Sequence, residues 1–207
     1  MNKKLLNLKR KLDKCGCTEW FSYIGSVLQN EVSLDSGITI HDLVEAMETH
    51  EKVYYLADIT SKGIVLDGQK LMDGLSDDDL AFLEHICDEL AELDGVSPFE
   101  ALINCGANAK QLIERLISDT PYATTISIDQ GTARSMVRHG VDPTLIFNHL
   151  SGGHLLDSLD ELLKAGLDYD RIDEYHLNRL ETGAEIRIRM ERFRRKTQKN
   201  RKKEVVV

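Results

Sequence analysis

Long apolar runs, paired cysteines and proline are scarce in this chain. No stretch of about eighteen apolar residues occurs, so the sequence predicts no membrane-spanning helix. Residues 1–14, MNKKLLNLKRKLDK, lack the unbroken apolar core of a signal peptide, and we expect a cytoplasmic protein. The four cysteines, Cys15, Cys17, Cys87 and Cys105, form neither a Cys-x-x-Cys pair nor a zinc knuckle, so we expect reduced thiols and no structural zinc.

Sequence signatures of catalysis are also missing. The chain has no Gly-x-Ser-x-Gly nucleophile turn, no phosphate-binding Gly-x-x-x-x-Gly-Lys loop and no dinucleotide-binding glycine fingerprint. His85 and Cys87 are two residues apart, which places them on different faces of a helix rather than around one metal ion. The sequence therefore predicts no catalytic residue, no metal site and no cofactor. An enzyme of unrecognised type stays open as an alternative, because active sites are assembled from residues far apart in sequence.

The charged residues are distributed unevenly along the chain, although the net charge is only −9. Residues 1–14 hold six Lys or Arg residues and one Asp, and residues 186–207 hold ten Lys or Arg residues and two Glu. Residues 73–100, in contrast, hold ten carboxylates and neither Lys nor Arg. An acidic body with two basic ends can contact partners of either sign.

What the sequence does contain is a repeated way to end one helix and start the next. LINCGANAKQLI, MVRHGVDPTLIF and LLKAGLDYDRID each place a glycine after a helical apolar pattern, followed by an apolar residue and then Asn or Asp. Glycine adopts the left-handed conformation that follows a helix, and Asn or Asp caps the next helix. From about residue 76 onward, this pattern predicts short helices joined by tight corners at Gly106, Gly140 and Gly166, with caps at Asn108, Asp142 and Asp168.

Residues 140–170 resemble an ankyrin repeat. The Asp-Pro-Thr after Gly140 and Val141, the Gly-Gly-His between helices and the Leu-Asp-Glu-Leu-Leu-Lys-Ala-Gly-Leu-Asp run all have counterparts in that family's pattern. The resemblance is confined to these residues, and the interval from Gly140 to Gly166 is shorter than the roughly 33 residues of ankyrin repeats. It implies stacked helical hairpins that present a surface to a partner and perform no catalysis.

The N-terminal part is less regular. Residues 2–14 and 18–29 predict two amphipathic helices, and Thr39 predicts the N-cap of a third. KVYYLADITSKGIVLDGQ contains two β-rich runs around Gly63, so we expect a small β-hairpin insert near residues 52–67, with residues 122–129 as a candidate third strand.

The predicted fold class is mainly α, with short helical hairpins stacked in an ankyrin-like, solenoid-like manner. We expect three parts: N-terminal helices with the β-hairpin in residues 1–74, a helical repeat region in residues 75–193, and a flexible basic tail in residues 194–207.

The acidic segment supplies the leading functional hypothesis. In the helix predicted within SDDDLAFLEHICDELAELDG, Glu84, Asp88 and Glu92 form an i, i+4 row with a spacing of about 6 Å, although like charges at this spacing are destabilising. The row approximates the charge density of nucleic-acid phosphates, which favours a nucleic-acid mimic. A solvated acidic face remains the alternative explanation. The predicted partner-binding residues are Asp77, Asp78, Glu84, Asp88, Glu89 and Glu92.

The basic C-terminal segment supplies a second hypothesis. Ile186, Met190 and Phe193 predict a helix that continues to about residue 195 and packs one apolar stripe on the last repeat. Basic residues in this segment would contact the backbone of RNA or DNA more than its bases, and the polar tail after the helix lacks aromatic residues, which argues against sequence-specific reading of single strands. A solubilising cap is the competing explanation. The candidate residues are Arg187, Arg189, Arg192, Arg194, Arg195, Lys196, Lys199, Arg201, Lys202 and Lys203.

The sequence thus predicts a non-catalytic protein–protein interaction module. It would act as an inhibitor or adaptor that docks a basic, nucleic-acid-handling protein through its acidic surface. The first alternative is an RNA- or DNA-binding adaptor that uses the C-terminal arm, and the second is the unrecognised enzyme. We expect no membrane partner, and the sequence leaves open whether the chain forms a homodimer.

Overall fold

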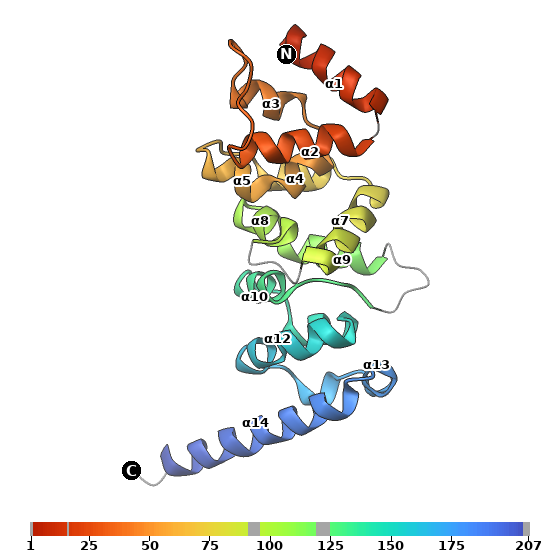
Figure 1. Ribbon diagram of the computed structural model, residues 1–207. Coiled ribbons are helices and arrows are strands. Elements are labelled where there is room, and N and C mark those ends of the chain that lie inside the picture. Colours follow the sequence, from red (N-terminus) through yellow and green to blue (C-terminus); the bar gives the residue numbers. More distant parts are fainter. Residues whose placement is uncertain (1, 16, 91–95, 119–124, 205–207) are drawn as a thin grey trace. The chain divides into compact units, whose positions relative to one another are not determined.

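The computed structural model describes residues 2–15, 17–90, 96–118 and 125–204, and it confirms a mainly helical protein (Figure 1). The described residues form fourteen α-helices and one 3-10 turn, and none of them lies in a β-strand. Contacts divide the chain into two units. Unit 1 comprises Met1–Leu83 and Asp94–Ala107, and unit 2 comprises Glu84–Leu93 and Asn108–Val207.

Unit 1 begins with two helices that follow the predicted bounds closely, α1 (Lys3–Cys15) and α2 (Cys17–Leu28). The remaining helices are short: α3 (Ile40–Ala46), α4 (Thr49–Tyr54), α5 (Leu56–Ser61), α6 (Gly68–Asp73), the first part of α7 (Asp77–Leu90), and α8 (Pro98–Asn104). The predicted cap of α3 is confirmed, because the Thr39 hydroxyl accepts from Asp42 N at 3.2 Å. Helix α1 packs on α2 and α3, and α8 packs on α4, α5 and α6.

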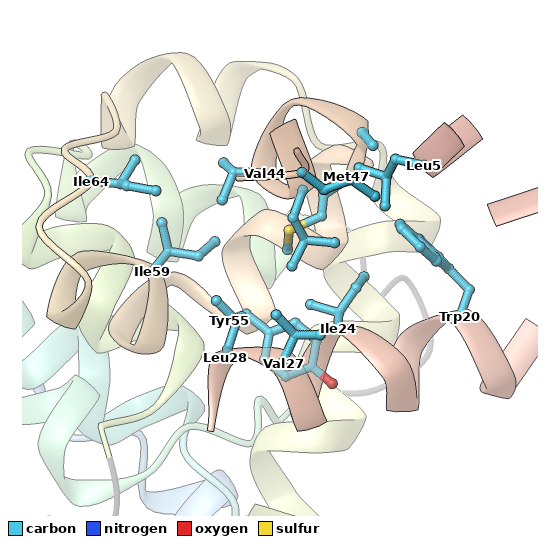
Figure 2. Close-up of a cluster of buried hydrophobic side chains, with 13 residues drawn as sticks. Leu5, Trp20, Ile24, Val27, Leu28, Val44, Met47, Tyr55, Ile59 and Ile64 are labelled. Atoms are coloured by element: carbon cyan, nitrogen blue, oxygen red, sulfur yellow. The ribbon is translucent and has the colours of Figure 1, made fainter. Parts of the chain in front are cut away.

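One hydrophobic cluster joins the first helices of unit 1 (Figure 2). Trp20 of α2 is only 2% exposed and lies at one edge of the cluster, which also includes Leu5 of α1, Val44 of α3 and Ile59 of α5. Burial of such side chains contributes about 1.5–3 kcal/mol each. The cluster therefore holds together helices that are distant from one another in the sequence.

A buried carboxylate borders this cluster. Glu51 Oε2 accepts hydrogen bonds from Trp20 Nε1 at 3.3 Å and from Glu48 N at 2.7 Å, so the polar group is satisfied although Glu51 is 5% exposed. Lys9 of α1 pairs with Glu48 at 3.0 Å and lies 5.6 Å from the centre of the Trp20 ring. These contacts tie α1 and α2 to the start of α4.

The predicted β-hairpin near residues 52–67 is wrong. Helices α4 and α5 occupy most of this segment, and Gly63 (φ +79°) ends α5 rather than forming a hairpin turn. Ile64 N donates to Ile59 O at 3.4 Å, which is the same closure that the sequence predicts at the later corners. Val53 and Ile59 are fully buried, so tertiary packing overrides their preference for strands.

The candidate third strand does not form in the described part of residues 122–129 either. Residues 122–124 lie outside the described residues. From residue 125 onward, the only sheet-like feature of this described segment is a parallel bridge between Ile126 and Leu150. Ile126 N donates to His149 O at 2.6 Å, and Ser151 N donates to Ile126 O at 3.0 Å.

Unit 2 contains the later helices: α9 (Ala109–Ser118), α10 (Gln130–Arg138), α11 (Pro143–His149), α12 (Gly152–Lys164), the 3-10 turn η1 (Tyr169–Arg171), α13 (Glu174–Arg179) and α14 (Gly183–Glu204). Helix α12 packs on α10, α11 and α14, and α13 packs on α11 and α14. Helix α14 continues nine residues beyond 195 in the helical conformation, to Glu204.

The three predicted corners are confirmed. Gly106, Gly140 and Gly166 have φ values of +98°, +84° and +95°. The apolar residue after each glycine donates its N–H to the carbonyl five residues earlier; for Val141 to Met136 the distance is 3.0 Å. The cap is present as well, because Asp142 Oδ1 accepts from Thr144 N at 2.9 Å. These positions require glycine because other residues adopt positive φ at a cost.

Polar side chains connect successive corners within unit 2. The buried Thr144 hydroxyl accepts from Asp168 N at 3.0 Å, and Arg171 pairs with Asp142 at 2.7 Å. Asn148 accepts from Asp173 N at 2.9 Å and donates to Arg171 O at 3.0 Å. The corner before α11 is thus bonded directly to the corner before α13.

Candidate interaction surfaces

The first turn of α7 carries three consecutive aspartates with different roles. Asp79 accepts from Ser76 N at 2.9 Å and from the Ser76 hydroxyl at 2.7 Å, and it pairs with His50 Nδ1 at 3.2 Å. Although burial raises the pKa of Asp79, the hydrogen bonds from Ser76 and the charge of His50 lower it below its usual value on balance. Asp77 and Asp78 are exposed. Asp79 is therefore structural, and the other two carboxylates face solvent.

Phe82 lies on the same helix, four residues after Asp78, and 43% of it is exposed. Residues at i and i+4 share a helix face, so Asp78 and Phe82 are neighbours. The Phe82 ring packs edge-on against two other rings. The distance between ring centres is 6.4 Å to Phe21 and 5.8 Å to His50. We call Asp77, Asp78 and Phe82 the acidic–aromatic surface, because Asp78 adjoins a partly exposed ring held by aromatic neighbours and the exposed Asp77 directly precedes Asp78 on the first turn of α7.

The other predicted partner-binding residues do not add to this surface in the described part of the chain. Glu84 is half-buried, and its Oε1 accepts from Ser127 N at 2.7 Å, so it serves the packing of unit 2. The side chains of Asp88 and Glu89, and the whole of Glu92, lie outside the described residues. Of the six predicted residues, Asp77 and Asp78 have described, exposed side chains, and Phe82 was not among the predicted residues.

A groove of about 800 Å³ lies in unit 1 between α3, α4, α6 and the segment that precedes α6. Its lining includes Lys52 and Lys70, and also Glu45 and Asp67, so basic and acidic side chains balance. Asp67 caps α6 by accepting from Lys70 N at 3.1 Å. The balanced charges select no ligand class.

The basic residues of α14 fall into two groups. Towards the start of the helix, Arg187 pairs with Glu174 at 2.6 Å, and Arg189 pairs with Asp160 at 3.2 Å. Further along, Arg194 lies 5.8 Å from the Tyr169 ring, and Arg192 and Lys196 are exposed. Arg195 pairs with Glu191 of the same helix at 2.9 Å. The side chains of Lys199, Arg201, Lys202 and Lys203 lie outside the described residues.

No metal centre accompanies these surfaces in the described residues, where no group of three His, Cys, Asp or Glu side chains is arranged to hold an ion. Within the same part of the chain, no helix combines the length and the apolar character that crossing a membrane requires. No protein-family model, curated protein or solved structure matches this chain. The functional proposals are therefore based on the exposed residues of α7 and α14.

Proposed function

We propose that this protein is a non-catalytic protein–protein interaction module whose acidic–aromatic surface binds a basic segment of a partner. The supporting observation is the partly exposed Phe82 ring, which shares a helix face with the exposed Asp78, while the exposed Asp77 precedes them on the first turn of α7. Aromatic side chains supply much of the binding energy at protein interfaces, and Arg or Lys of a partner can lie over such a ring. The carboxylates add charge complementarity, which speeds association and selects basic partners.

Charge in the surrounding sequence supports a basic partner. Residues 71–109 contain neither Lys nor Arg, so the sequence around Asp77 and Asp78 is acidic. Proteins that handle nucleic acids present basic grooves to phosphates, and a carboxylate-rich surface can occupy such a groove. An inhibitor or adaptor of a nucleic-acid-handling protein fits this chemistry.

The unit 2 architecture that we propose for this module is an ankyrin-like stack of helical hairpins. Helices α11 and α12 form one pair and α13 and α14 the next, and each helix of the first pair contacts its counterpart in the second. The hydrogen bond from Asp168 N to Thr144 links the two pairs at their corners. Nearest-neighbour contacts of this kind stabilise repeat proteins, which use their continuous surfaces to bind partners.

Selection of short random peptides on the intact protein tests the proposed function. We expect the selected peptides to be rich in Arg and Lys. Replacement of Asp78 by Lys should weaken the affinity of a selected peptide about tenfold or more, equivalent to about 1.4 kcal/mol.

Asp157→Lys is the matched control, since Asp157 is an exposed carboxylate on α12 and the charge change is the same. It should change the affinity less than about twofold. Equal weakening by both variants, or selection of peptides without basic residues, would refute a specific acidic–aromatic surface.

A further inference from the structure

We propose that the C-terminal half of α14 binds double-stranded DNA by lying in its major groove and contacting phosphates through its exposed cations. The proposal concerns unit 2 and is independent of the acidic–aromatic surface. It rests on where the contacts of α14 end, on how its cations are arranged, and on the dimensions of the groove.

The first half of α14 is firmly held. Ile186 is fully buried, and Arg187 and Arg189 make ion pairs and hydrogen bonds with α12 and α13, among them the bond from Arg189 to Leu156 O at 3.1 Å. Arg194 over Tyr169 is the last ion-pair, hydrogen-bond or ring contact between a described α14 side chain and the rest of unit 2. In Figure 1 the C-terminal end of α14, in dark blue, lies away from the other helices of this unit. Beyond the anchored half, the side chains of Arg195 and Lys196 are exposed to solvent.

Cations of the distal half follow the helical repeat. With 3.6 residues in each turn, Arg195 and Lys196 lie on one side of the helix, and Arg192, just before the distal half and followed by the half-buried Phe193, lies within about 100° of both. Positions 199, 202 and 203, which are also basic, continue the same spacing along the helical backbone. Arg194 lies roughly on the opposite side, where it packs over the Tyr169 ring of unit 2. The described cations of α14 that make no contact with the rest of unit 2 therefore lie on one side of the helix.

The groove dimensions favour duplex DNA. An α-helix with its side chains is about 10–12 Å wide, and the major groove of B-form DNA is about 12 Å wide, so phosphates flank an inserted helix on both sides. A-form RNA has a major groove that is too deep and narrow for this insertion. A helix inserted in this groove brings its row of exposed cations next to a phosphate strand.

Other polyanions fit less well. A helix that lies on a membrane needs an apolar face, whereas residues 194–204, RRKTQKNRKKE, contain no apolar side chain to insert into lipid. Binding of single strands relies on aromatic stacking, and the same residues include no aromatic ring. The chemistry that remains is an array of phosphates, held rigidly by a duplex.

The test measures how tightly the intact protein binds a labelled DNA duplex of arbitrary sequence between about 50 and 200 mM salt. The variant combines Arg192→Gln, Arg195→Gln and Lys196→Gln, which keep helix-forming side chains and remove three charges. The control combines Lys3→Gln, Lys4→Gln and Lys11→Gln, because these exposed lysines of the basic helix α1 give the same charge change. Circular dichroism verifies that both variants fold.

We expect the α14 variant to bind about tenfold more weakly or worse at low salt. The slope of log affinity against log salt concentration should become shallower by about 0.9 for each phosphate that the variant no longer neutralises. The α1 control should keep the affinity and salt dependence of the unaltered protein. Equal weakening of both variants, or no binding to duplex DNA, would overturn the proposal. Tighter binding to duplex RNA or to single-stranded DNA of equal length would overturn the assignment to the DNA major groove.

Discussion

Unit 1 and unit 2 hold short helices together in different ways. In unit 1 a hydrophobic cluster around Trp20 gathers side chains from helices that are far apart in sequence, with the buried Glu51 carboxylate at its edge. In unit 2 polar groups bond one corner to the next, as Thr144 does with Asp168 N. A change in unit 1 should therefore affect several helices together, whereas a change at a corner of unit 2 should affect mainly its neighbours.

Truncation of Trp20 should have the largest effect. Trp20→Ala removes the largest side chain of the unit 1 cluster and one of the two hydrogen-bond donors to Glu51, so we expect the free energy of unfolding to fall by about 3–5 kcal/mol. Amide hydrogen exchange should rise in α1, α2 and α4 together. Trp20→Phe keeps most of the ring and should cost less. Faster exchange confined to α2 would show that the cluster does not unite these helices.

Gly68 offers the next test within unit 1. A Cβ at this position would come within 2.5 Å of Leu102 O and 2.8 Å of Cys105 O, both backbone atoms of or just after α8. Gly68→Ala should therefore push α6 away from α8. We expect the free energy of unfolding, measured by chemical denaturation, to fall by about 1–3 kcal/mol. Gly153→Ala, in α12 of unit 2, meets no atom within 4 Å and serves as the control. A neutral Gly68→Ala would contradict the close approach of the two segments.

The corner bond of unit 2 can be broken without changing the size of a side chain. Thr144→Val removes the hydroxyl that accepts from Asp168 N and leaves a partly buried donor unpaired, so we expect the free energy of unfolding to fall by about 1–2 kcal/mol. Thr144→Ser keeps the acceptor and should retain more stability than Thr144→Val. Hydrogen exchange should rise from α11 to α13 and leave unit 1 unchanged. Equal stability of the Val and Ser variants would show that this bond does not stabilise the corner.

His176 gives the smallest expected effect. It is buried, its Nε2 lies 3.1 Å from Leu150 O, and burial lowers its pKa below the usual value. The unfolded chain therefore binds a proton at a higher pH than the folded chain, so stability is present above about pH 6.5 and falls as the pH drops below it. Denaturation at several pH values should show this slope in the unaltered protein and a shallower slope in His176→Gln. Identical slopes would exclude His176 as a cause.

Features that depend on residues close together in the sequence could be predicted, whereas features that depend on contacts between distant residues could not. The corners at Gly106, Gly140 and Gly166 were predictable because the glycine and the following Asn or Asp lie within a few residues. The β-hairpin was wrong because Val53 and Ile59 owe their helical conformation to packing partners elsewhere in the chain.

The candidate site shows the same limit. The exposed carboxylates Asp77 and Asp78 could be predicted from an acidic run without Lys or Arg. The role of Phe82 depends on Phe21 and His50, which reach it from α2 and α4. The only local signal for it was an aromatic residue four positions after an exposed Asp, which is also common in buried helix faces. Similarly, no local sequence pattern predicts that Glu84 accepts a hydrogen bond from Ser127 N.

Amide hydrogen exchange of the intact protein, with and without a selected Arg- and Lys-rich peptide, tests most directly whether the acidic–aromatic surface binds basic partners. We expect slower exchange in the first turns of α7 and in α4, around Asp78, Phe82 and His50, with unit 2 helices α11 to α14 unchanged. Slower exchange confined to unit 2, or no change anywhere while the peptide is bound, would contradict the acidic–aromatic surface as the binding site.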